Sequence, residues 1–199
     1  MTSGTEYEIK TAIESSQLAS ICEGFEWVSE SKLSDQYFDT ADRRLFLAGV
    51  FVRLRNGGRV DIKYNADIND VSHSHCSDTG YSYPLSESDK LVIREFIGEF
   101  LDLGPESDIL GSCLVPFVRI EKLRNDYVRP GLTLSVDEVA GLGLFVELEA
   151  DSVSHVSAMY EIFRAHSLDN LPVGYVEIYL RSYNYPLYLQ GRYVLPDDK

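Results

Sequence analysis

The stretch most informative about the fold is residues 50–64, which read VFVRLRNGGRVDIKY. Apolar and charged side chains alternate on both sides of the Asn-Gly-Gly at 56–58, with Arg53 and Arg55 before it and Lys63 after it. Alternation with a period of two is typical of strands with one buried face, and Asn-Gly is a strong hairpin signal. The stretch therefore predicts two antiparallel strands joined by a tight turn, with basic side chains sharing one face.

Like-signed pairs of charges recur on other predicted strands. Glu6 and Glu8 lie two residues apart, and so do Glu147 and Glu149. Such side chains point to the same side of a strand, about 6.6 Å apart, so each pair repels itself unless an opposite charge lies between. Acidic pairs could converge on a divalent cation, and the arginine pair of the hairpin could grip a phosphate chain. For any single pair, a solvated strand face is the alternative.

The rest of the chain predicts an α+β protein dominated by strands. Apolar residues recur at helical spacing in three stretches, which are expected to be helices: 11–22, 86–101 and 152–166. Further strands are expected at 5–10, 35–39, 80–85, 116–127, 132–136, 144–149 and 175–180, and a polar loop at 65–77. No repeat or composition break marks a linker, so one domain, 1–183, is expected, followed by a Tyr-rich tail, 184–199.

Composition excludes several classes of protein. Of the 199 residues, 44% are hydrophobic, and 18 Lys+Arg against 32 Asp+Glu give a net charge of −14. The apolar content argues against disorder, and the net charge argues against duplex nucleic acid or anionic membranes as partners. No apolar run approaches the roughly 18 residues of a membrane span. Three cysteines without CxxC spacing, and no basic-then-apolar leader, favour a cytoplasmic protein with reduced thiols.

The charged strand faces suggest a polar interior. If all of them point inward, the sheet must close into a barrel whose apolar outer face is covered by helices. The interior would then hold five acidic and six basic residues: Glu6, Glu8, Asp137, Glu147 and Glu149, with Lys10, Arg53, Arg55, Lys63, Lys122 and Arg124. Because these charges nearly cancel, the site suits a ligand of mixed charge, such as a metal–triphosphate complex.

Several motifs occur in a fixed order along the chain. They are Glu6-Tyr7-Glu8-Ile9-Lys10, an ExExK pattern, then Tyr37-Phe38-Asp39-Thr40, Arg53-Leu54-Arg55, Ile62-Lys63, Lys122-Leu123-Arg124, Asp137, and Phe145-Val146-Glu147-Leu148-Glu149. In this order and spacing the chain resembles the CYTH superfamily, the triphosphate tunnel metalloenzymes. That superfamily includes thiamine triphosphatases, inorganic tripolyphosphatases and class IV adenylyl cyclases. The resemblance spans residues 5–180.

The resemblance implies a closed antiparallel eight-stranded tunnel, flanked by helices, that binds a triphosphate with Mg²⁺ or Mn²⁺. The metal ligands that it implies are Glu6, Glu8, Asp137, Glu147 and Glu149. The substrate-binding residues that it implies are Lys10, Arg53, Arg55, Lys63, Lys122 and Arg124. Lys10 is also expected to be catalytic by activating water, with Tyr37 as its partner. This is the logic of phosphoryl transfer, in which metal and cations neutralise charge on the transferring group.

The expected activity is metal-dependent hydrolysis of a small triphosphate: inorganic tripolyphosphate, thiamine triphosphate or a nucleoside triphosphate. One alternative is a class IV adenylyl cyclase, which converts ATP to cyclic AMP and pyrophosphate. Another is a non-catalytic module that binds polyphosphate or a nucleotide. This alternative is motivated by residues 80–84, GYSYP, where the superfamily commonly carries an Arg and a Glu on its fifth strand. The Tyr-rich tail makes a homodimer a further expectation.

The spacing of the basic residues at 119–124 does not fit one strand face. Arg119 lies an odd number of positions from Lys122, whereas Lys122 and Arg124 share a parity. We therefore expect a β-bulge here, or one residue that points outward.

Overall fold

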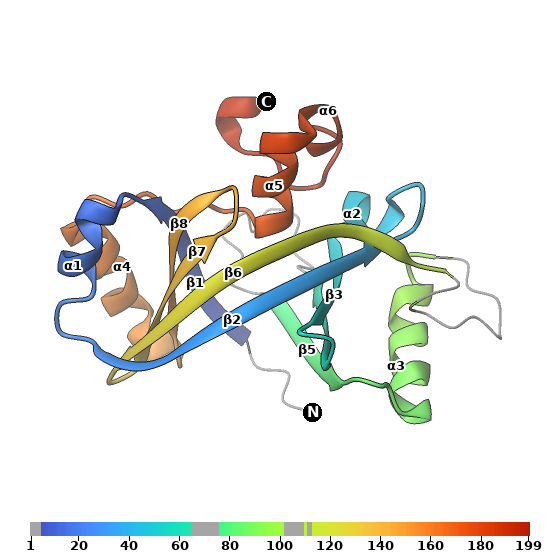
Figure 1. Cartoon of the computed structure of the whole chain (residues 1–199), viewed down its shortest axis with the longest axis horizontal. Coiled ribbons are helices and arrows are strands. Elements are labelled where there is room, and N and C mark those ends of the chain that lie inside the picture. The colour runs from blue at the N-terminus through green and yellow to red at the C-terminus, as the bar shows by residue number, and fades with distance from the viewer. Residues whose placement is uncertain (1–4, 65–75, 102–109, 111–112) are drawn as a thin grey trace.

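A computed structural model describes residues 5–64, 76–101, 110 and 113–199. Its strands run antiparallel to their neighbours in one sheet, in the order β1-β5-β4-β3-β2-β6-β7-β8 (Figure 1). The strands are β1 Thr5–Ile13, β2 Glu26–Asp39, β3 Val50–Arg55, β4 Arg59–Tyr64, β5 Cys76–Ser82, β6 Val115–Arg129, β7 Leu132–Val139 and β8 Gly143–Ala150.

The seam between β1 and β5 corrects the expectation of a closed barrel. Although the strand order is cyclic, β1 pairs with β5 only at Thr5↔Ser77 and Glu6↔Cys76. Farther along β1, the outer edge is occupied by the segment at 170–171: Asn170 Oδ1 accepts from the Lys10 amide at 3.1 Å, and the Leu171 amide donates to the Lys10 carbonyl at 2.6 Å. The sheet is therefore not closed along its length, because another segment satisfies the backbone groups that β5 would pair with.

The hairpin predicted at 50–64 is confirmed. β3 and β4 pair from Val50↔Tyr64 to Arg55↔Arg59. Asn56 and Gly57 at the turn both have positive φ, 50° and 66°, as the right-handed twist of a tight hairpin requires.

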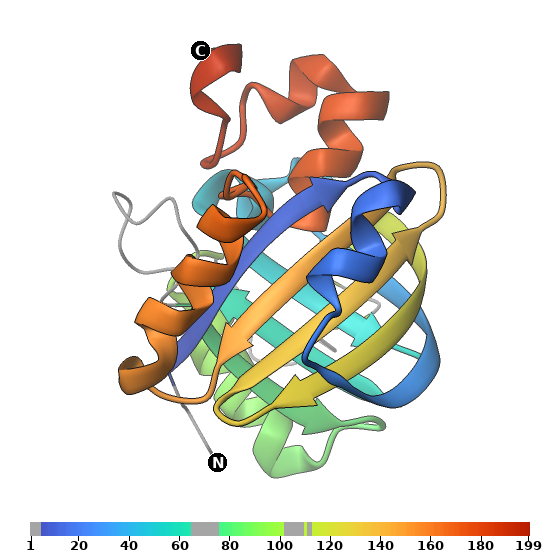
Figure 2. The same ribbon diagram turned by 90° about the vertical axis from the view of Figure 1, so that its left-hand side faces the viewer.

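Helices lie around the sheet (Figure 2). They are η1 Ser15–Gln17, α1 Leu18–Ile21, α2 Arg44–Ala48, α3 Glu87–Gly98, η2 Val153–His155, α4 Val156–Ala165, α5 Tyr175–Tyr183, α6 Tyr185–Tyr188 and η3 Pro196–Asp198. The helices predicted at 86–101 and 152–166 are thus confirmed. Of these helices, α1 and α4 lie against the outer face of the sheet, and α5 and α6 lie at one end. At the start of α3, Ser86 accepts a hydrogen bond from the Asp89 amide in a capping box.

Two predicted elements are wrong. The helix expected at 11–22 begins later, because β1 continues to Ile13 and leaves room only for η1 and α1. The strand expected at 175–180 is helix α5, in which Val176 and Leu180 are buried on one side, four residues apart. A short apolar run fits either period, and packing against the sheet decides between them. The loop expected at 65–77 lies mostly outside the described residues.

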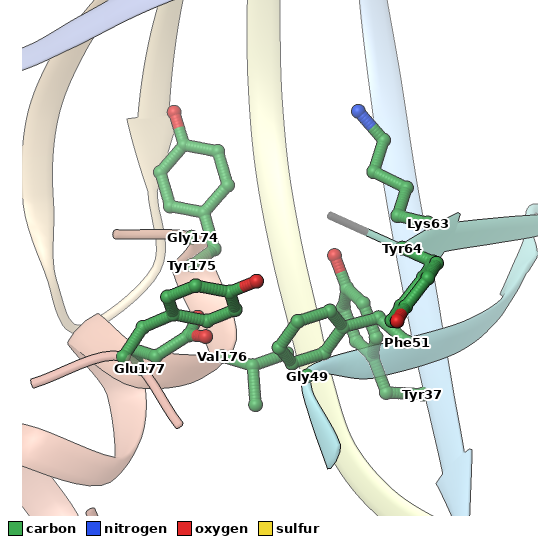
Figure 3. Close-up of a pocket in the computed structure, with 10 residues that line it drawn as sticks. Tyr37, Gly49, Phe51, Lys63, Tyr64, Gly174, Tyr175, Val176 and Glu177 are labelled. Atoms are coloured by element: carbon green, nitrogen blue, oxygen red, sulfur yellow. The ribbon is translucent and has the colours of Figure 1, made fainter. Parts of the chain in front are cut away.

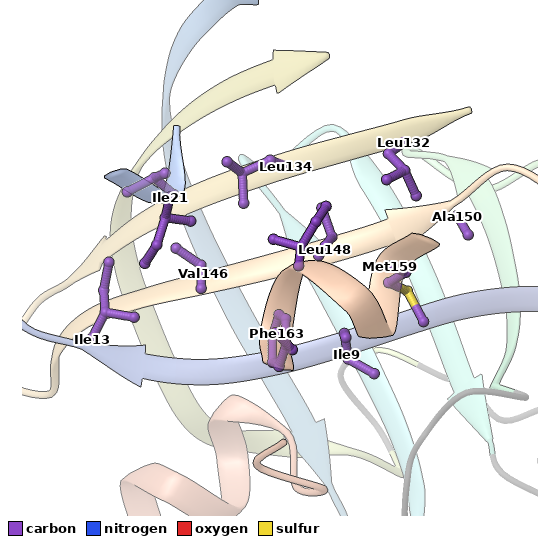
Figure 4. Close-up of a cluster of buried hydrophobic side chains, with 12 residues drawn as sticks. Ile9, Ile13, Ile21, Leu132, Leu134, Val146, Leu148, Ala150, Met159 and Phe163 are labelled. Atoms are coloured by element: carbon purple, nitrogen blue, oxygen red, sulfur yellow. The ribbon is translucent and has the colours of Figure 1, made fainter. Parts of the chain in front are cut away.

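The apolar side chains lie between the sheet and the helices, on the outer face of the strands. Figure 4 shows one such cluster, in which Ile9, Val146 and Leu148 of the sheet pack against Met159 and Phe163 of α4. A second cluster places α3 over the outer face of β3 and β4. Since side chains alternate along a strand, this packing turns the charged faces inward.

A third cluster is the exception. Its residues Ile120 and Phe145 share the inward parity of the cavity residues on β6 and β8. Tyr175 of α5 packs against Phe145 at one end of the sheet.

The segment after residue 183 packs onto the rest of the protein. Figures 1 and 2 show α5 and α6 together at one end of the sheet. Tyr188 is completely buried and Tyr193 nearly so, whereas Tyr183 and Tyr185 are exposed. Within the described residues, none of the helices has both the length and the apolar character that crossing a membrane demands.

Candidate active site

The inward faces of the strands line a cavity of 270 Å³. Ten of the predicted site residues line it: Glu8, Lys10, Tyr37, Arg53, Arg55, Lys63, Lys122, Arg124, Glu147 and Glu149. The sequence analysis did not assign four others on this wall: Arg59, Ser135, Gly174 and Tyr175. Asp137 lies behind the wall, and the side chain of Glu6 lies outside the described part of the chain.

The wall formed by β1 and β8 carries the acidic residues. In the register of these strands Glu8 lies opposite Glu149, and Lys10 lies opposite Glu147. Lys10 Nζ is 2.9 Å from Glu147 Oε1 and 3.6 Å from Glu8 Oε1. Burial lowers the pKa of Lys10, but the two carboxylates outweigh it, so this pKa ends above its ordinary value. Lys10 is therefore a permanent cation here.

A buried cluster around Asp137 holds two further cations in place. Asp137 Oδ2 accepts hydrogen bonds from Lys122 Nζ at 2.6 Å and from the Tyr175 hydroxyl at 2.8 Å. Asp137 Oδ1 accepts from Arg124 Nε at 2.7 Å, and Arg124 also donates to Glu147. Both oxygens of Asp137 are therefore engaged, its side chain has no exposed surface, and it orients Lys122 and Arg124. Its role as a metal ligand stays a prediction of the resemblance.

Tyr175 enters this cluster from α5, outside the sheet. Its ring centroid lies 4.4 Å from Lys10 Nζ and 4.5 Å from Lys122 Nζ, within cation–π range. Burial and the nearby Arg124 together lower the pKa of Lys122 to about 8, although Glu147 and Asp137 act to raise it. No sequence signal placed Tyr175 here, because residues 175–180 were predicted to be a strand.

The wall formed by β3 and β4 carries paired arginines. Arg55 makes a bidentate contact with Asp35 at 2.7 and 2.8 Å, and Arg53 donates to Asp61 at 3.1 and 2.8 Å. Asp35 and Asp61 are fully buried, and a buried charge persists only when it is paired. Sequence reasoning missed both aspartates as site residues, although Asp61 shares the inward parity of Lys63.

Arg119 points away from the cavity. Its side chain is 63% exposed, and its Nε lies 2.5 Å from Glu121 Oε1. The pairing of β2 with β6 shifts register between Gln36 and Phe38, next to this point. The expectation of an irregularity near 119–124 is thus confirmed, and Lys122 and Arg124 line the cavity without Arg119.

The carboxylates of the cavity fit a divalent cation in part. Among the described residues, no group of three or more His, Cys, Asp or Glu side chains forms a complete metal site. Glu8 and Glu149, however, face each other across β1 and β8, where like charges destabilise one another. Mg²⁺ typically takes one or two carboxylates together with water and substrate phosphates, so this pair is sufficient protein ligation for it.

A smaller cavity of 60 Å³ adjoins this one and shares part of its lining (Figure 3). Tyr37, Lys63 and Tyr175 line both cavities, and Glu177 of α5 lines the smaller one. Glu177 is 1% exposed, and neither of its carboxylate oxygens has a well-formed hydrogen bond within the described structure. Burial raises the pKa of Glu177 to about 7.

Solved structures with this fold come from distant organisms. A protein from Pyrococcus horikoshii OT3 is 19% identical with a TM-score of 0.61, over 89% of this chain and 99% of that chain. A protein from Vibrio parahaemolyticus, provisionally named an adenylate cyclase, is 17% identical with a TM-score of 0.59, over 89% and 99%. A Hippeastrum protein, provisionally named an adenylyl cyclase and described as having a dominant triphosphatase activity, is 18% identical with a TM-score of 0.56, over 96% and 98%.

At these identities the solved structures show the fold alone. No curated protein matches the sequence. The family model of the CYTH domain matches residues 4–170, which include every strand of the sheet. The chain therefore belongs to the CYTH domain family.

Proposed function

We propose that the protein hydrolyses a small triphosphate in the 270 Å³ cavity with the help of Mg²⁺ or Mn²⁺. One observation carries the proposal: the six predicted cationic side chains and a facing pair of carboxylates line the same cavity. The cations are Lys10, Arg53, Arg55, Lys63, Lys122 and Arg124, and the carboxylates are Glu8 and Glu149. The dominant triphosphatase activity described for the Hippeastrum protein supports hydrolysis in preference to cyclisation.

The protein contributes position and charge to this reaction. Phosphoryl transfer asks for little covalent chemistry, and most of the catalysis comes from stabilising charge on the transferring group. Arg53 and Arg55 are already aligned by Asp61 and Asp35, so little side-chain freedom is lost when phosphate binds. A divalent cation held by Glu8 and Glu149 would supply Lewis-acid neutralisation of phosphate oxygens.

Lys10 and Tyr37 have roles that follow from their protonation states. The carboxylates around Lys10 keep it charged, so it stabilises negative charge on the phosphates and does not remove a proton from water. Burial raises the pKa of Tyr37, so its hydroxyl stays neutral and is able to orient a water by hydrogen bonding.

The test compares three substrates. Tripolyphosphate, thiamine triphosphate and ATP are each incubated with the protein and Mg²⁺ or Mn²⁺, while phosphate, pyrophosphate and cyclic AMP are measured. We expect release of phosphate that stops when the metal is chelated. Cyclic AMP with pyrophosphate from ATP would contradict hydrolysis and favour a cyclase. Tight binding without turnover would favour a non-catalytic module.

Lys63→Ala tests the cavity as the binding site. Because Lys63 lines both cavities, we expect its loss to raise KM about tenfold, the effect of one removed charge-assisted contact. Lys32→Ala, at an exposed position of β2, is the matched control and should leave KM unchanged. Equal kinetics for the two variants would place the substrate elsewhere.

A further inference from the structure

Arg59 is a cation of the cavity wall without a role in the account above. It is the first residue of β4, and its side chain is 59% exposed, the most exposed of the arginines on this wall. Its Nε lies 2.5 Å from Asp61 Oδ1, while Asp61 Oδ2 accepts from Arg53. One buried carboxylate thus anchors an inner and an outer arginine together.

The neighbouring strand leaves space for the Arg59 guanidinium. In the pairing of β4 with β5, Gly80 lies opposite Asp61. A Cβ atom at position 80 would lie 2.5 Å from Arg59 Nη2, 2.7 Å from its Nε and 2.8 Å from its Cζ. These distances are shorter than van der Waals contact. The guanidinium therefore occupies the space that the side chain of any residue other than glycine would fill at position 80.

The cations of β3 and β4 form a row from the deep end of the cavity to its mouth. Successive inward positions pair as Phe51↔Lys63, Arg53↔Asp61 and Arg55↔Arg59, about 6.6 Å apart along the strands. The exposed fraction of the arginine side chains rises along the row, from 9% for Arg53 to 22% for Arg55 and 59% for Arg59. Positive charge therefore extends to the opening of the cavity.

We propose that Arg59 determines specificity by binding the outer phosphate of an inorganic polyphosphate chain, and that Gly80 makes this position possible. The proposal rests on the proposed function, namely that this cavity takes triphosphates. A nucleoside triphosphate that enters with its terminal phosphate first places an uncharged ribose beyond its third phosphate, at the mouth, whereas a chain of four phosphates places a charged phosphate there. A guanidinium makes charge-assisted, bidentate hydrogen bonds to the anionic oxygens of a phosphate, whereas an uncharged sugar has no such oxygens.

Binding experiments with tetrapolyphosphate and ATP test this proposal. Dissociation constants are measured by calorimetry for the wild type and for Arg59→Gln. We expect Arg59→Gln to weaken tetrapolyphosphate binding about tenfold, the loss of one charge-assisted contact, and ATP binding less than about twofold. Arg59→Lys, which keeps the charge without the planar fork, should fall between the wild type and Arg59→Gln for tetrapolyphosphate.

Gly80→Ala tests the same contact without touching Arg59. Its methyl group would displace the guanidinium, so it should weaken tetrapolyphosphate binding in the same direction as Arg59→Gln. Gly58→Ala is the matched control on the adjoining turn, since a Cβ there meets nothing within 4 Å, and it should bind like the wild type. Circular dichroism verifies that each variant is folded.

The outcomes separate this inference from the proposed function. Equal weakening for both ligands, or no weakening in Arg59→Gln, would overturn the inference even if hydrolysis is observed. Conversely, a wild type that binds tripolyphosphate but hydrolyses nothing would overturn the proposed hydrolysis, while the selectivity of Arg59→Gln would still decide the inference.

Discussion

The two charged walls of the cavity differ in how their charged side chains are paired. On β3 and β4, every described arginine of the wall is paired with a buried aspartate, Asp35 or Asp61. On β1 and β8, two carboxylates of like charge, Glu8 and Glu149, lie directly opposite each other. The basic wall is therefore organised before a ligand binds, whereas the acidic wall gains most when a cation arrives.

This difference predicts that mutations on the two walls have different consequences. Breaking a pair on the basic wall leaves a buried charge without a partner, which destabilises the fold itself. Neutralising Glu8 or Glu149 on the acidic wall leaves the fold intact and changes the response to metal. Glu177, which lines the smaller cavity, has features of both cases. Its side chain is buried, and its neutralisation is expected to change how stability responds to pH.

Asp61→Asn is expected to have the largest effect. It removes the carboxylate that Arg53 and Arg59 share and leaves Arg53 buried without its main partner. We expect the free energy of unfolding in urea to fall by roughly 3–5 kcal/mol, as for other broken buried ion pairs. Asp42→Asn, at an exposed aspartate, is the control and should change it by less than about 0.5 kcal/mol. Similar values for both variants would mean that the basic wall is not organised by buried pairing.

Glu177→Gln is expected to have the next largest effect, and one that depends on pH. Burial raises the folded-state pKa of Glu177 to about 7 from an ordinary value of 4.5. The folded state therefore binds this proton more tightly, so its stabilising contribution is present at low pH and is lost as pH rises through about 7. The loss between pH 4.5 and 8 is at most about 3 kcal/mol for this group.

Glu177→Gln should remove that part of the pH dependence, because an amide does not titrate. Unfolding free energies measured at several pH values between 5 and 8 are compared for the wild type, Glu177→Gln and Glu161→Gln, whose side chain is exposed on α4. The control should follow the wild type. If Glu177→Gln also followed the wild type, Glu177 would have to be charged in the folded protein at every pH tested.

Much of the basic wall could be predicted from sequence, because its determinants are local. Alternation with a period of two assigns Arg53, Arg55 and Lys63 to one face, and the positive-φ turn at 56–58 sets their register. The covering of the opposite face by helices then decides that the charged face is the inner one. The same reasoning could have included Asp61 and Arg59, which have the same parity.

The features that could not be predicted depend on contacts between distant segments. Tyr175 reaches the cavity from a helix that has a strand-like pattern, and only packing against β6 and β8 selects the helix. The incomplete seam beside β1 depends on Asn170 and Leu171, far from β1 in sequence. Asp137 has the inward parity of a site residue, but its burial beneath Lys122 follows from the three-dimensional arrangement.

Glu8→Gln is expected to have the smallest effect on stability and the clearest effect on metal binding. Without metal, it relieves repulsion from Glu149 but also loses the weak 3.6 Å attraction to Lys10, so the free energy of unfolding should change by less than about 0.5 kcal/mol. With Mg²⁺ or Mn²⁺, the wild type should melt at a higher temperature, because a cation that binds only the folded state stabilises it. Glu8→Gln should lose this shift, and Glu138→Gln, exposed on β7, should keep it. An unchanged shift in Glu8→Gln would mean that the acidic wall does not hold the cation, and the contrast between the two walls would then be one of charge alone.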